Sequence, residues 1–458
     1  MTIDEETGRI EEMDAWRFQT YVETQLVPFA WRGNVRQPQS MSLADARAVL
    51  RSDAFVRPLR KLRRINLVRL PIMRSDGRIE LLPRGYDAGS SIFTMNDALE
   101  YDETWDLQRA RLFLDDLLAE FPFADERSLG VHILAMLSVF GADILGPDAK
   151  RLSFLYRANA SRAGKGLLAA TAICGPHGRV RVQAIPDEAA EFKKILDTEA
   201  LNGSPYVFLD EVEGKVNNRT LNSFLTASVW TGRLMNSQKY FAVPQTATVF
   251  MTGNNVDLSQ DLAGRCVLVD LFVSTADPQE REIRHVIDEG FLVRPEVRAD
   301  LLSALWAFVR HWDKSLRPRP ATTFRGFETF SSLFGGMVVA AGYAMPLKSV
   351  AAQIDPDFAD MLALVGKLAE GVQSRAEYDF AAVVDICREI GVFEWWVLNR
   401  QRGASADTFE LTAKARSWLG KTFSERYGGT SFRLVDGRRA RFGNRGKNRQ
   451  RRYTIELL

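Results

Sequence analysis

Three short apolar runs that each end in polar residues constrain the fold of this chain more than any other feature. The first, Phe154-Leu-Tyr156, leads into a loop that ends at Gly164-Lys165 and opens an apolar helix. The second, residues 206–209, ends in Asp-Glu, and the third, residues 249–251, ends in Thr-Gly-Asn-Asn. Strands of this kind, alternating with helices, predict a parallel sheet with both faces covered. Because ligands bind at the carboxyl edge of such sheets, we expect the polar ends to meet there.

The segment from residue 159 to 168 has the composition of a phosphate-binding loop. In the usual pattern, G-x-x-x-x-G-K-[ST], the backbone and the lysine hold the phosphates of a nucleotide. Asn159 replaces the first glycine, a mild change because asparagine tolerates left-handed backbone. Gly166 replaces the Ser/Thr whose hydroxyl helps to hold magnesium, which leaves water or Ser161 to substitute for it. The alternative is a helix start that contains Gly-Lys-Gly by chance. The predicted nucleotide-binding residues are Asn159, Ser161, Ala163, Gly164, Lys165, Gly166 and Leu167.

The two later strands supply candidate catalytic groups. Asp210 ends its strand and is expected to hold Mg²⁺, whereas Glu211 is expected to orient and activate a water molecule. Asn254 is expected to hydrogen-bond the terminal phosphate or the attacking water. The alternatives are two surface acids and an asparagine-rich turn that caps a strand.

Arg265 follows the third strand closely, in the run Asp261-Leu-Ala-Gly-Arg. An arginine in this position is suited to reach the ATP of a neighbouring subunit and to stabilise transition-state charge. This prediction requires a second copy of the chain. The alternative is a surface salt bridge.

These four elements in this order resemble the Walker A, Walker B, sensor 1 and arginine-finger motifs of the AAA+ family. The segments around them resemble ATPases of phages, plasmids and integrated elements, which are similar to superfamily 3 and MCM-like replicative helicases. The resemblance covers roughly residues 65–345 and departs at Gly264, where relatives often carry a second arginine. It implies ATP and Mg²⁺ as cofactors, DNA as a partner and a homo-oligomer, expected to be a ring of six. The runs that carry it are Pro71–Gly77, Gly85–Asp87, Phe208–Val212, Leu225-Thr226, Trp230–Arg233, Thr252–Val256, Asp261–Arg265 and Gly326–Phe330.

Two regions are candidates for DNA contact. Residues 232–244 fit a hairpin, and in helicases of the resembled kind such a hairpin carries a lysine into the central pore. Lys239 is suited to a DNA phosphate and Tyr240 to a base, although both also fit an ordinary exposed loop. Near the C-terminus, a helix over 409–423 and a basic strand–turn–strand have the pattern of a winged helix. The alternative there is a solvated basic tail. Its candidate DNA-binding residues are Arg438, Arg439, Arg441, Arg445 and Lys447.

Composition narrows the class of protein. Apolar residues make up 46% of the 458 residues, and the net charge is only +2, so the chain fits an ordinary globular protein and not a polycation. The three cysteines form no CxxC pair and the four histidines have no metal-ligand spacing, which disfavours a zinc site. The acidic start, Met1-Thr-Ile-Asp-Glu, is unlike a signal peptide, and no apolar run reaches the length of a bilayer crossing. We therefore expect a cytoplasmic protein with no membrane partner.

The sequence thus predicts an α/β protein, with an AAA+ parallel sheet sandwiched by helices. The expected division is a small mixed N-terminal domain (1–100), a helical linker (101–146), the ATPase core (147–275), a helical extension (276–400) and a basic winged-helix-like module (401–458). The expected function is an ATP-dependent DNA helicase or translocase in the replication of a mobile genetic element. Two alternatives stay open: an ATPase that remodels protein in regulation or defence, and a DNA-binding initiator with little or no ATPase activity.

Overall fold

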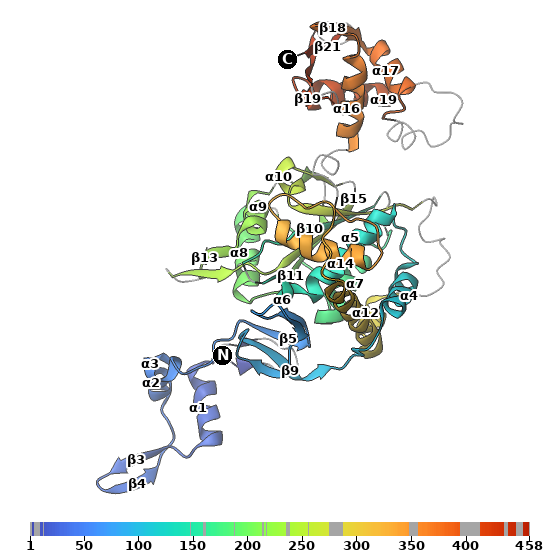
Figure 1. Cartoon of the computed structure of the whole chain (residues 1–458). Coiled ribbons are helices and arrows are strands. Elements are labelled where there is room, and N and C mark those ends of the chain that lie inside the picture. The colour runs from blue at the N-terminus through green and yellow to red at the C-terminus, as the bar shows by residue number, and fades with distance from the viewer. Residues whose placement is uncertain are drawn as a thin grey trace. The chain divides into compact units, whose positions relative to one another are not determined.

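A four-stranded parallel sheet organises the larger of two units in the computed structural model of this chain, shown in Figure 1. The units are Met1–Lys348 and Ser349–Leu458. The structure describes residues 2–3, 10–11, 13–146, 148–158, 162–186, 188–212, 215–216, 218–234, 239–254, 256–273, 287–347, 356–393, 413–434, 438–445 and 452–457.

The order of the parallel strands is β11-β15-β10-β17. Helices cover both faces of the sheet, so the predicted mixed α/β layer structure is confirmed. On one face, Phe154 and Phe250 stack with ring centroids 5.5 Å apart beneath α5 and α7. On the other, Leu155 and Met251 share a core with α8 and α9. The elements are β10 (Ser153–Ala158), β11 (Tyr206–Val212), β15 (Thr248–Asn254), β17 (Cys266–Leu271), α5 (Glu126–Phe140), α7 (Lys165–His177), α8 (Ala189–Leu201) and α9 (Arg219–Thr226).

A layer of helices packs beside α7. In the expected helical extension, α12 (Pro295–Lys314) packs against α4 (Leu107–Leu118) and α7. It is followed by α13 (Glu328–Phe330), a π turn (Ser331–Gly335) and α14 (Gly336–Ala340). Only glycine fits at position 336, because a Cβ there would lie 2.3 Å from the Pro318 carbonyl oxygen.

The region before residue 100 was expected to be a separate domain, but it is not a separate unit in the structure. Asp143 of α6 (Ala142–Leu145) pairs with Arg63, 2.6 Å apart, and with Arg64, and it is almost fully buried. These contacts join the first strands to the helices of residues 101–146, and residues 64–68 also pack against α7, so the structure places no unit boundary at residue 100 or 146. The elements of this region are α1 (Ala15–Gln25), β3 (Phe29–Arg32), β4 (Val35–Pro38), α2 (Leu43–Arg51), α3 (Asp53–Val56), β5 (Arg64–Val68), β6 (Pro71–Met73), β7 (Ile79–Leu81), β8 (Gly85–Asp87) and β9 (Ile92–Leu99).

The smaller unit corrects the expected boundary at residue 401. Met361 and Val383 lie in the same hydrophobic core as Phe423, Phe442 and Tyr453, so residues 356–393 belong with the C-terminal module and not with a helical extension. Its antiparallel sheet has the order β18-β21-β20-β19. The elements are α16 (Pro356–Leu368), β18 (Arg375–Asp379), α17 (Phe380–Glu389), α19 (Ala413–Lys421), a π turn (Thr422–Arg426), β19 (Ser431–Arg433), β20 (Arg439–Arg445) and β21 (Arg452–Leu457).

Short elements complete the described chain: β1 (Thr2–Ile3), β2 (Ile10–Glu11), β12 (Lys215–Val216), β13 (Val229–Arg233), β14 (Tyr240–Pro244), β16 (Asp257–Leu258), α10 (Gln260–Ala263) and α11 (Glu289–Leu292). Of the helices in the described ranges, none combines the length and the apolar character that a membrane crossing requires.

Candidate nucleotide site

Lys165 and Asn254 meet at the carboxyl edge of the parallel sheet. Lys165 is the first residue of α7, just beyond β10, and Asn254 is the last residue of the neighbouring β15. The lysine Nζ donates a hydrogen bond of 2.7 Å to Asn254 Oδ1. Partial burial lowers the pKa of Lys165, while the negative charges of Asp210 and Glu211 act against that shift. An anion placed here would therefore find a partly desolvated cation at a helix N-terminus.

Asp210 is fixed by a neighbour that sequence reasoning had not assigned. The Thr252 hydroxyl donates a short hydrogen bond to Asp210 Oδ1, and Thr252 is almost fully buried. The same carboxylate oxygen accepts a hydrogen bond of 3.0 Å from the Glu211 backbone N–H. These two hydrogen bonds orient the Asp210 carboxylate. The Thr252 hydroxyl is buried, so it has to find its hydrogen-bond partner within the protein. The Thr that precedes Gly253-Asn254 was visible in the sequence, but its role depends on the pairing of β11 with β15.

Glu211 is presented by an irregularity in β11. Its φ is +54°, in the left-handed region that side chains other than glycine seldom occupy. The pairing with β15 shifts register between Leu209 and Val212, as in a β-bulge, which redirects side chains near functional sites. Gly253 accommodates the shift, since a Cβ there would lie 2.2 Å from the Val212 carbonyl oxygen. As a result Glu211 is exposed at the same edge as Lys165.

Gly166, in the first turn of α7, lies beside the Asp210 carboxylate. A Cβ added at Gly166 would lie 3.8 and 4.0 Å from the two Asp210 carboxylate oxygens. Gly164, which precedes the helix, has a φ of +85°, and a Cβ added to it would lie 3.5 Å from the Phe121 ring. Ala163 is buried and Leu167 partly buried, so both support the loop from within the fold. The predicted residues Asn159 and Ser161 lie outside the described residues.

A magnesium ion fits this edge. Among the described residues, no three His, Cys, Asp or Glu side chains gather into a metal-binding group. Magnesium bound to nucleotide phosphates usually takes only one or two protein carboxylates and retains several waters. Asp210, held by Thr252 and lying beside Gly166, is therefore the residue suited to this role.

Arg265 does not lie at the edge of the sheet where Lys165, Asp210, Glu211 and Asn254 are found. It directly precedes β17, whose first residue pairs with Ser153 at the start of β10, so Arg265 lies at the amino end of the sheet. Its carbonyl oxygen accepts a hydrogen bond of 2.9 Å from Ser153 Oγ. Since β10 has six residues, Arg265 and Lys165 are separated by about 20 Å along the strand direction.

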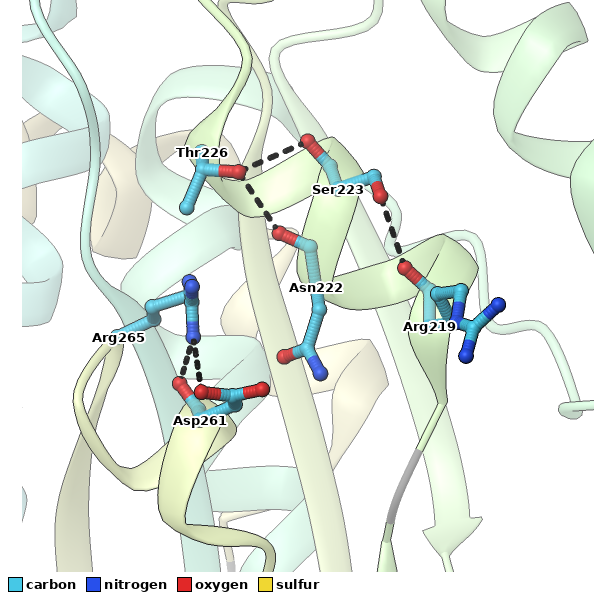
Figure 2. A pocket seen from close by; sticks show the side chains of 6 residues that line it. All are labelled: Arg219, Asn222, Ser223, Thr226, Asp261 and Arg265. Carbon is cyan, nitrogen blue, oxygen red and sulfur yellow. Dashed lines mark hydrogen bonds and ion pairs between the residues drawn. The ribbon is translucent and has the colours of Figure 1, made fainter.

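Arg265 lines a polar cavity of about 350 Å³, shown in Figure 2. Its guanidinium donates to the Asp261 carbonyl oxygen and lies 3.9 Å from the Asp261 carboxylate. Within the described residues, its buried Nε has no hydrogen-bond partner. The remaining lining residues come from α9 and are Arg219, Asn222, Ser223 and Thr226. The cavity is thus lined by two arginines and one carboxylate, and this net positive charge suits an anion.

The expected hairpin is present. Strands β13 and β14 pair antiparallel, with Arg233 opposite Tyr240. Lys239 is exposed, and Tyr240 is 79% exposed, among the most exposed aromatic side chains described. At the base, Trp230 Nε1 donates a hydrogen bond of 2.7 Å to Asp197 of α8. The hairpin is therefore attached to α8 at its base and exposes a cation, Lys239, and an aromatic ring, Tyr240, to solvent.

In the smaller unit, β20 carries a basic face. Ala440 and Phe442 point into the core, whereas Arg439 and Arg441 point outward, as strand alternation requires. Arg438 and Arg445 are also exposed. The predicted Lys447 lies outside the described residues.

Comparisons with known proteins give only distant likenesses. No family model matches the chain, and no curated protein matches it. Similar solved structures include the apo C-terminal region of NrS-1, which is 14% identical, with 79% of this chain and 77% of that chain covered and a TM-score of 0.33. Two structures of JCV helicase are 12% identical, with 52% of this chain and 66% of that chain covered and a TM-score of 0.25. Likenesses this weak carry no weight for function, which has to be inferred from the residues themselves.

Proposed function

We propose that this chain is an AAA+-type ATPase that moves along or unwinds DNA during replication of a mobile genetic element. The observation that carries the proposal is the 2.7 Å hydrogen bond between Lys165 and Asn254, beside the Asp210–Thr252 pair. A cation, an oriented carboxylate, a second exposed acid and a neutral amide converge at the edge where parallel sheets bind ligands.

Each residue has a role that its chemistry suits. Lys165 and the first N–H groups of α7 would hold the phosphates of ATP. Asp210 would hold Mg²⁺, which neutralises phosphate charge when bound. Glu211 would accept a proton from the attacking water, and Asn254 would orient that water or the terminal phosphate.

The position of Arg265 supports hydrolysis between subunits. Because it lies at the opposite end of the sheet from Lys165, it cannot reach the nucleotide held by its own chain. A neighbouring copy in a ring would bring it there, and we propose six subunits. The cavity around Arg265 and Arg219 would then receive the phosphate charge of the neighbouring nucleotide.

DNA-dependent hydrolysis tests this function. We expect single-stranded DNA to stimulate ATP hydrolysis, and the stimulation to fall as salt rises because phosphate contacts release counterions. Lys239→Ala should abolish most of the stimulation and leave the basal rate unchanged. The matched control is Lys194→Ala, which removes an exposed lysine from α8, the helix that packs against the same hairpin. If DNA does not change the rate of hydrolysis and Lys239→Ala has no effect, the result would favour an ATPase that remodels protein.

Gly166 favours a second candidate, a DNA-binding initiator that hydrolyses little or no ATP. The missing hydroxyl weakens the expected hold on magnesium. This candidate predicts DNA binding through the arginines of β20 without release of phosphate. Phosphate release in the assay above would exclude it.

A further inference from the structure

Strands β3 and β4 form a hairpin near the N-terminus (Figure 1). This hairpin carries an exposed cluster of two aromatic rings and a cation. Trp31 pairs with Arg36 across the strands, and Phe29 pairs with Pro38, so Phe29, Trp31 and Arg36 share one face. The Arg36 guanidinium lies 4.7 Å from the Phe29 ring centroid and 5.0 Å from the Trp31 ring centroid. Phe29 is 47% exposed and Trp31 59% exposed. Large rings left open to solvent in this way indicate a binding surface.

The charge around this face indicates the kind of partner. The hairpin itself, residues 29–38, contains two arginines, Arg32 and Arg36, and no acidic side chain. A second copy of the chain would bring the same positive charge, so the charge disfavours self-association through this face. A polyanion is favoured instead.

We propose that the Phe29–Trp31–Arg36 face binds single-stranded nucleic acid. The rings would stack with unpaired bases, and Arg36 would contact the phosphates. Duplex bases are stacked on one another and do not offer their faces to exposed rings, so the strand must be single. The proposal goes beyond the helicase assignment, because it concerns a third surface, distinct from the Lys239 hairpin and the β20 arginines.

Substitutions in the full-length protein test the role of the ring. Binding of a fluorescent oligothymidylate would be measured by anisotropy, without ATP, in a Lys239→Ala background. Trp31→Ala should weaken binding roughly tenfold, as expected for loss of one stacked base, whereas Trp31→Phe keeps a ring and should bind nearly normally.

Two arginine substitutions that remove the same charge distinguish binding at this face from general electrostatic attraction. Arg36→Ala and Arg32→Ala each remove one exposed arginine from the same hairpin, but Arg32 follows Trp31 and lies on the opposite face. We expect Arg36→Ala to weaken binding several-fold more than Arg32→Ala. Equal effects would overturn the proposal in favour of nonspecific attraction.

Crosslinking locates the contact independently of affinity. With an oligonucleotide that carries photoreactive thymines, crosslinks should appear in the peptide spanning residues 29–38 and disappear in Trp31→Ala. The absence of crosslinks there, or altered sedimentation of Trp31→Ala without loss of DNA affinity, would overturn the proposal in favour of a protein contact. Since ATP turnover is not measured, failure here is distinguishable from failure of the ATPase assignment.

Discussion

At the scale of single residues, Gly166 is the position where this site differs most from the usual phosphate loop. A Cβ at this position would lie in ordinary van der Waals contact with the Asp210 carboxylate. We predict that Gly166→Ser restores a hydroxyl near the metal position and lowers the Mg²⁺ concentration for half-maximal hydrolysis by several-fold. Magnesium titrations of steady-state hydrolysis measure this.

Gly166→Ala is the matched control for that substitution. It adds the same Cβ, with a helix-propensity gain over glycine of about 0.5–1 kcal/mol, but no oxygen. Identical magnesium dependence of the alanine and serine variants would show that the hydroxyl is not what this position lacks.

The sequence could predict which polar residues gather at this edge, but not how each is held. Lys165, Asp210 and Asn254 follow apolar strands, and parallel strands share a carboxyl edge, so their approach follows from the pattern. The left-handed backbone of Glu211 belongs to a register shift between β11 and β15, and the Thr252–Asp210 contact requires that these two strands be neighbours. Such a shift is decided by tertiary packing, for which the sequence of one strand contains no signal.

At the scale of elements, His132 of α5 joins the strand and the helix on either side of the phosphate loop. Its Nδ1 lies 3.0 Å from the Tyr156 hydroxyl of β10, and its Nε2 lies 2.8 Å from the Thr171 hydroxyl of α7. Thr171 already donates to the Leu168 carbonyl oxygen, so it accepts from Nε2–H and Tyr156 donates to Nδ1. A second proton on the ring would have no acceptor in this arrangement.

We predict that this buried histidine makes the fold sensitive to acid. Burial lowers the pKa of His132 to about 3, well below its ordinary value of 6.5. Between these values the unfolded chain binds a proton that the folded chain does not, so the free energy of unfolding falls as pH falls. The loss is at most about 1.4 kcal/mol per pH unit for each such residue. Burial lowers the pKa of His177 to about 3 as well, so it adds to the effect.

Denaturant unfolding at pH 7 and pH 5 measures this loss. His132→Gln removes one titrating group, so the variant should lose less stability over that interval than the original chain, whatever its stability at pH 7. The same loss in both proteins would contradict the assignment of His132 as a neutral, buried histidine.

Several elements could not be predicted because their partners lie far away in the chain. The run Arg375–Asp379 is largely polar, yet it forms β18 by pairing with β21. Strand β17 was not expected, although it completes the parallel sheet beside β10. By contrast, α5 and α12 lie in the regions expected to be helical, 101–146 and 276–400, and α7 begins at Lys165 as the phosphate-loop pattern predicts. A helix can be predicted in this way because its apolar pattern is contained within one segment.

At the scale of the whole molecule, Arg265 and Lys165 lie at opposite ends of one sheet, so in the proposed mechanism a complete site would combine residues of two neighbouring copies. We predict that Arg265→Ala and Lys165→Ala are each inactive alone, and that mixing them restores part of the activity. In an equimolar mixture about one interface in four combines an intact lysine with an intact arginine, so recovery of roughly a quarter is expected.

Hydrolysis rates of the pure and mixed variants measure this complementation, with co-assembly checked by sedimentation. Mixed assemblies that form but stay inactive would show that Arg265 does not act on a neighbouring nucleotide.

The most direct test of a single hydrolytic site at this edge is ATP turnover by Glu211→Gln, measured together with ATP binding. Without the carboxylate that accepts the proton of the attacking water, turnover should fall by about 10²–10⁴-fold while ATP still binds, because Lys165 and α7 are intact. Glu191→Gln, which alters an exposed acid on α8, should behave as the original chain. Normal turnover by Glu211→Gln would contradict the site described here.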